Sequence, residues 1–168
     1  MINAPFELPQ EDNNPLDLID YLSREKTWLY TRFDEETLDL VLPGQKTKYD
    51  ASMEWQGEFS ALVIAVIMPI KMQDEHMQVT AEALEKINQN LWLGHFDLSG
   101  QGKSATFRHT LLLRGVPANI AIDLIADIFD LAIAECNRFY STFQLARLGD
   151  GRLHDDLHAA VLETVGEA

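Results

Sequence analysis

The sequence predicts an α+β protein in which an antiparallel sheet packs with helices, and three observations predict it. Between residues 37 and 56, apolar side chains recur at every second position, as in strands with one wet face. Helical periodicity appears before this region, in residues 15–26, and after it, in residues 117–143. Short turns separate the successive strands, and such turns join antiparallel neighbours.

The first element is a short amphipathic helix over residues 15–26. Asn14 can cap free N–H groups, and Pro15 fixes φ at the first helical position. Leu18, Ile19 and Leu22 then recur on one face.

A four-strand meander follows from Trp28 onward. Leu38, Leu40 and Leu42 share a face of one strand. In the next strand the apolar series is Thr47, Tyr49, Ala51, Met53 and Trp55. The fourth run, residues 59–68, is apolar on both faces, which predicts a position at the centre of the sheet.

A second helix over residues 80–90 precedes a C-terminal hairpin made of residues 91–98 and 105–114. A two-residue turn at Gln101 and Gly102 fixes the register of this hairpin. One side then carries Trp92, Gly94, Phe96, Leu98, Ala105, Phe107, His109, Leu111 and Leu113. The other side mixes apolar and charged residues and sets His95 opposite Arg108.

The third helix, predicted over residues 117–143, is more apolar than one sheet face can cover. A second surface, either another helix or another subunit, should pack there, and we therefore expect a homodimer. Leu153, Leu157, Val161 and Leu162 indicate a final short helix.

Length and charge limit the function. The 168 residues (19.0 kDa) suit one domain, expected over residues 14–168 after an extended N-terminal arm at 1–13. Thirteen Lys and Arg against 27 Asp and Glu leave a charge of −14, which disfavours nucleic-acid and membrane-surface partners. Residues 1–14 lack the basic start and the apolar stretch of a targeting signal. The apolar run 61–70 is about half as long as a membrane-spanning helix requires. The single cysteine suits a reducing compartment. We expect a soluble, cytoplasmic protein.

Four motifs suggest chemistry, and each has a simpler interpretation. Residues 97–104 (DLSGQGKS) resemble a phosphate-binding loop, but Asp97 replaces its first glycine and a strand follows the loop. His154 and His158 lie one helical turn apart without an evident third metal ligand. Asp123, Asp127 and Asp130 could hold a divalent metal ion, but they are more simply a solvated stripe on an apolar helix. Cys136 has no base nearby in the sequence that would activate its thiol, so a buried, unreactive residue is the simpler interpretation.

The sequence therefore predicts no catalytic residue, metal site or cofactor. The remaining candidates lie on the mixed side of the hairpin, where Leu93 and Leu112 would flank a local basic cluster. One interpretation is a surface ladder in which Asp97 offsets Arg108. The other is a docking patch for a protein partner, formed by Leu93, His95, Arg108, Leu112 and Arg114.

Three stretches, together with the order of the elements, resemble the bacterial YbjN-domain proteins. They are residues 87–96 (INQNLWLGHF), 107–115 (FRHTLLLRG) and 162–168 (LETVGEA). Members are described as sensory-transduction regulators, and their fold is similar to that of class I type III secretion chaperones, which are small, acidic, usually dimeric proteins that bind other proteins. The resemblance implies a cytoplasmic protein of alphaproteobacterial type with no catalytic residues to transfer.

Two hypotheses follow for the function. The first is a non-catalytic, dimeric protein-binding module, either chaperone-like or regulatory. The second is a small-ligand-sensing or enzymatic domain with a pocket between helix and sheet, for which His95, His109 and Arg108 are the available convergent polar groups.

Overall fold

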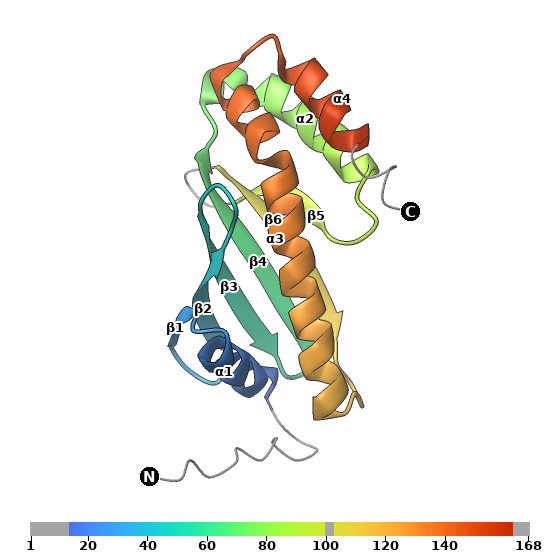
Figure 1. Cartoon of the computed structure of the whole chain (residues 1–168). Coiled ribbons are helices and arrows are strands. Elements are labelled where there is room, and N and C mark those ends of the chain that lie inside the picture. Colours follow the sequence, from blue (N-terminus) through green and yellow to red (C-terminus); the bar gives the residue numbers. More distant parts are fainter. Residues whose placement is uncertain (1–13, 100–102, 163–168) are drawn as a thin grey trace.

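A six-stranded antiparallel sheet forms the centre of the computed structural model, which describes residues 14–99 and 103–162 (Figure 1). The elements, in chain order, are α1 (Pro15–Glu25), β1 (Leu29–Arg32), β2 (Thr37–Pro43), β3 (Lys48–Gln56), β4 (Ala61–Lys71), the 3₁₀ turn η1 (Asp74–His76), α2 (Met77–Gln89), β5 (His95–Ser99), β6 (Ser104–Leu112), α3 (Ala118–Leu148) and α4 (Leu153–Leu162). This confirms the predicted α+β class. The expected N-terminal arm at 1–13 and the tight turn at 101–102 lie outside the described residues.

The strands follow the order β1-β2-β3-β4-β6-β5, and every neighbouring pair is antiparallel. The predicted meander is therefore confirmed as β1 to β4. The hairpin joins the same sheet, because β6 pairs with β4. As its doubly apolar sequence predicts, β4 lies inside the sheet.

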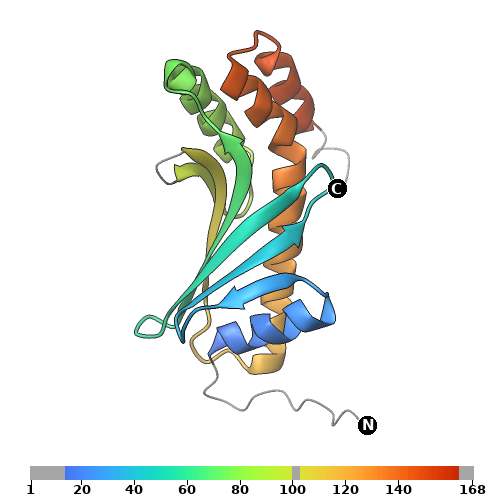
Figure 2. The same ribbon diagram turned by 90° about the vertical axis from the view of Figure 1, so that its left-hand side faces the viewer.

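Helices cover one face of this sheet. Apolar side chains of alternating strand positions, such as Leu40, Met53 and Ile64, are buried on that face. The helix α3, which is 31 residues and roughly 46 Å long, crosses it, and α1 lies beside the first turns of α3 (Figures 1 and 2). Strand residues on the other face, including Asp39, Ser52 and Thr110, are exposed to solvent. We call this second face the open face.

Helices of the same chain cover much of the apolar surface of α3. The helix α1 packs near its start, and α2 and α4 pack around its end (Figure 1). Arg138 joins α3 to α4, because its Nε donates to the carbonyl of Ala160 at 2.7 Å while its Nη1 pairs with Glu135 at 3.0 Å. Ile120 and Leu124 remain 47% and 37% exposed. The homodimer expected from this surplus stays a prediction.

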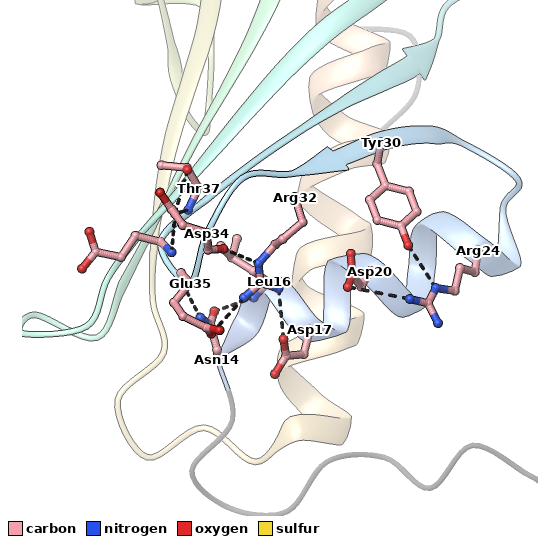
Figure 3. Close-up of polar contacts among 11 residues, drawn as sticks. Asn14, Leu16, Asp17, Asp20, Arg24, Tyr30, Arg32, Asp34, Glu35 and Thr37 are labelled. Atoms are coloured by element: carbon pink, nitrogen blue, oxygen red, sulfur yellow. Dashed lines mark hydrogen bonds and ion pairs between the residues drawn. The ribbon is translucent and has the colours of Figure 1, made fainter.

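A polar network fastens α1 to the β1–β2 hairpin (Figure 3). Asn14 caps α1 by accepting from the N–H of Leu16 at 2.9 Å, as predicted, and its side-chain amide donates to the carbonyl of Glu35. Arg32 of β1 reaches Asp17 of α1 at 3.0 Å. In the turn, the Asp34 carboxylate accepts from the Thr37 hydroxyl at 2.8 Å, and this bond, aided by backbone N–H groups, lowers the pKa of Asp34.

Several predicted boundaries are wrong. The helix expected over residues 80–90 already begins at Met77, and the strand expected over residues 59–68 runs from Ala61 to Lys71. The strand expected over 91–98 begins only at His95, because Gly94 has φ +70° and a Cβ there would lie 2.3 Å from the ring of Phe107. Trp92, which precedes this turn, is 77% exposed and does not share the core side with Phe96. The third helix extends to Leu148, past the expected end at residue 143.

Gly149 ends α3 in a left-handed conformation, with φ +61°. A Cβ at this position would lie 2.6 Å from the imidazole of His76, whose Nδ1 is 2.8 Å from the carbonyl oxygen of Arg147. The end of α3 is thus held against the start of α2.

We therefore predict that Gly149→Ala lowers the free energy of unfolding by about 1–2 kcal/mol from backbone strain alone. Urea denaturation measures this loss. Gly151→Ala is the matched control, because Gly151 has no positive φ and open space at its Cβ position. Equal losses in the two variants would contradict the assignment of strain to Gly149.

Candidate functional site

The hairpin register brings the predicted polar residues together on the open face. His95 lies opposite Arg108, and Asp97 lies opposite Thr106, as the sequence predicts. The Nε of Arg108 donates to Asp97 Oδ2 at 2.7 Å, and the two side chains are 36% and 39% exposed. A half-exposed cross-strand ion pair therefore occupies the position proposed for the docking patch.

The structure separates the remaining members of that patch. Leu112 is 72% exposed at the end of β6, and Arg114 is exposed just beyond it. Leu93 is partly buried and packs against the core, so it is less exposed than expected, and its role in docking stays a prediction. Its displacement follows from the late start of β5, since the turn at Gly94 breaks the alternation assumed for residue 93.

His109 lies on the helix-covered face, because it pairs with Ile64 of β4 while its neighbour Arg108 pairs with Ala65. His95, His109 and Arg108 consequently do not converge on one pocket. Burial, and to a lesser extent the charge of His95, lower the pKa of His109 below its usual value of about 6.5.

A groove follows the open face. A depression of about 510 Å³ lies over β1 to β4, and its outward-facing side chains are Leu29, Thr31, Asp39, Val41, Asp50, Ser52 and Ile67. A second depression of about 710 Å³ shares Asp50 and Ile67, continues along β4 to Lys71 and Ser104, and ends against Arg147 of α3. The groove combines an apolar floor with acidic residues at the β1 end and basic residues at the far end.

The two edges of the sheet differ. Within an antiparallel ladder, the N–H and C=O of alternate residues point away from the neighbouring strand. At the β5 edge both groups of Phe96 are occupied by one side chain of α2, because Asn88 Oδ1 accepts from the Phe96 N–H at 2.8 Å and Asn88 Nδ2 donates to its carbonyl at 3.0 Å. Sequence reasoning missed this role. Its only signal was an Asn seven residues before the strand.

The other His, Asp and Cys residues that suggested chemistry in the sequence lie on helices, away from the open face. His154 and His158 are exposed on α4, and Asp123, Asp127 and Asp130 are exposed along α3. Among residues 14–99 and 103–162, no three His, Cys, Asp or Glu side chains are grouped to hold a metal ion. Cys136 is buried, as predicted, and burial together with the charge of Glu135 raises its pKa, which makes it a poor nucleophile. None of the helices in the described part of the chain is long and apolar enough to span a membrane.

Comparison with known proteins identifies one family. The model of the YbjN family, described as "Putative bacterial sensory transduction regulator", matches residues 15–145, which include α1 to β6 and most of α3. No curated protein sequence matches the chain.

Replacing Asn88 should be costly, because it leaves the buried backbone groups of Phe96 unpaired. We predict that Asn88→Ala lowers the free energy of unfolding by about 1–3 kcal/mol, measured by urea denaturation. Asn90→Ala is the control, since the exposed Asn90 amide bonds only the carbonyl of Lys86 at the end of the helix. A loss in Asn88→Ala no larger than that of Asn90→Ala would show that Asn88 does not secure the β5 edge.

The low pKa of His109 predicts a pH dependence with a definite sign. The folded state takes up a proton at this site at lower pH than the unfolded chain does, so its contribution to stability is full above about pH 6.5 and falls as the pH drops below that value. His109→Gln should reduce the slope of unfolding free energy against pH between 7.5 and 5.5. An unchanged slope in His109→Gln would contradict the burial assigned to His109.

Proposed function

The chain belongs to the YbjN family, and from that premise we propose that it is a non-catalytic protein-interaction module that binds a partner through the open face of its sheet. The observation that carries this proposal is the one-sided packing of the sheet. Helices cover one face, whereas the other presents a groove and exposed apolar side chains.

The composition of the open face favours a protein partner. A solvated sheet face is usually polar, yet Leu29 and Leu112 at its two ends are 69% and 72% exposed. Val63 and Ile67 of β4 lie half-buried between them. Exposed apolar anchors separated by charged pairs such as Arg108–Asp97 are typical of protein–protein contact surfaces.

Within this role we propose a regulatory or chaperone-like activity in the cytoplasm, with the homodimer expected from α3 as the form that binds. The ligand-sensing hypothesis has less support. Its three polar groups lie on opposite faces of the sheet, and none of them lines either depression.

Site-specific photo-cross-linking in cells of the source organism tests this proposal. A benzoylphenylalanine at Ser52, exposed in the middle of the open face, should yield a discrete cross-linked species of higher mass. The same group at Asp127, exposed on α3, is the control for the helical side. Cross-links from Asp127 but not from Ser52 would overturn the assignment of the binding face.

Arg108→Glu should reduce the Ser52 cross-link by more than roughly tenfold, because it replaces the basic group of the patch and repels Asp97, and tenfold corresponds to about 1.4 kcal/mol. The variant should still fold, since a half-exposed ion pair contributes only about 0–1 kcal/mol. Arg152→Glu is matched in charge and also loses an ion pair to an aspartate, but it lies between α3 and α4. Equal effects of the two substitutions would mean that net charge, not this patch, determines binding.

A further inference from the structure

We propose that β1 and the acidic end of the groove beside it bind one extended segment of a partner protein, which adds to the sheet as a seventh strand and carries alternating apolar residues with flanking Lys or Arg. This inference rests on the proposed function and names the partner chemistry that the open face recognises. Four observations carry it: the free edge, the apolar side chains on that edge, the surrounding charge, and the closure of the opposite edge.

β1 is the terminal strand at its side of the sheet, and within residues 14–99 and 103–162 no strand pairs with its outer edge (Figures 1 and 2). The N–H of Phe33 donates to the carbonyl of Thr37 at 3.1 Å, which places the odd-numbered residues in bonds to β2. By alternation, the N–H and C=O of Tyr30 and Arg32 point outward. Two residues with outward-facing N–H and C=O groups, separated by one residue, form the template that an added strand requires.

The opposite edge does not offer the same template. Asn88 already donates to and accepts from the backbone of Phe96, which is one of the outward-facing residues of the five-residue strand β5. An added strand there would have to displace a part-buried side chain held by two hydrogen bonds. The structure therefore directs strand addition to β1.

Side chains on the open side of β1 suit an apolar partner. Leu29 is 69% exposed and lies opposite Val41 of β2, and Phe33, four positions further along the same side, is 63% exposed. Thr31 lies between them and lines the groove. An added strand would place every second side chain beside Leu29 or Phe33, so those residues of the partner should be apolar.

The charge around this edge is acidic. Asp39 and Asp50 line the groove next to β1, and Glu35 and Glu36 are exposed in the turn that follows it. Arg32 pairs with Glu35 at 3.4 Å and with Asp17 of α1 at 3.0 Å, so it offsets Glu35 (Figure 3). Its side chain lies on the α1 side, which leaves Asp39 and Asp50 as the acidic groups that line the groove on the open side. Charge complementarity therefore favours Lys or Arg in the bound segment.

Two other occupants fit less well. A second copy of the chain, paired edge to edge through β1, would bring the acidic ends of two grooves together in molecules that each carry a net charge of −14. The chain's own residues 1–13 contain Glu7, Glu11 and Asp12 and no Lys or Arg, and their two prolines interrupt strand pairing. Neither occupant supplies basic residues that would complement the charges of Asp39 and Asp50.

The test is selection from a displayed library of random 12-residue peptides against the full-length protein, followed by synthesis of the most enriched peptide. We expect enriched peptides to alternate apolar residues at every second position and to carry flanking Lys or Arg. The double substitution Asp39→Lys and Asp50→Lys should raise the Kd of the synthetic peptide at least tenfold. Glu82→Lys with Glu85→Lys, on the exposed side of α2, makes the same charge change as a control.

Single N-methylation along the synthetic peptide separates strand addition from side-chain docking without altering the protein. Methyl groups on amides that face Tyr30 or Arg32 should abolish binding, and those on intervening amides should not, which gives a period of two. Enrichment of acidic peptides, absence of enrichment, uniform tolerance of N-methylation, or equal effects of the two double variants would each overturn the inference. If the Ser52 cross-link persists alongside any of these results, the inference is wrong while the proposed binding face stands.

Discussion

The packing of α3 across one face of the sheet is the contact on which the rest of the structure depends. Phe139 and Phe143 of α3 meet Phe96 of β5 with ring centroids 6.0 and 5.1 Å apart, and Phe96 meets Phe107 of β6 at 5.5 Å. Aromatic contacts of this kind add to the free energy gained by burying the side chains. One long helix supplies these contacts from one side. Within the part of the chain that the structure describes, the other side of the sheet has no equivalent helical layer and forms the open face.

The same helix makes the two edges of the sheet unequal. The end of α3 holds the start of α2 through His76 and the carbonyl of Arg147, and α2 in turn carries Asn88 to the backbone of Phe96. At the other side of the sheet, α1 packs below β1 and its polar contacts reach the side chains of Tyr30 and Arg32 (Figure 3). The helices thus close the β5 edge and support β1 without pairing with it. An open face next to an open edge is the arrangement expected of a protein that binds an extended partner.

Local sequence patterns predicted the elements well where one periodicity dominated. The alternation of Tyr49, Ala51 and Met53, the cap at Asn14 and the register of His95 against Arg108 are all confirmed. The predictions failed where a single backbone angle decided the outcome, as at Gly94, since a glycine alone does not reveal its φ. The edge role of Asn88 and the groove between β1 and β4 depend on contacts between distant parts of the chain. No spacing within the sequence encodes them, so they required the structure.

The exposure of the open face in the free protein is measured most directly by cysteine labelling. The native Cys136 is buried, so an engineered cysteine can be labelled selectively in the folded protein. Ser52→Cys should react with a maleimide nearly as fast as in the unfolded chain, whereas Met53→Cys, on the helix-covered face, should be protected by a large factor. If Ser52→Cys is protected as strongly as Met53→Cys in the purified protein, another surface already covers this face and the central claim is wrong.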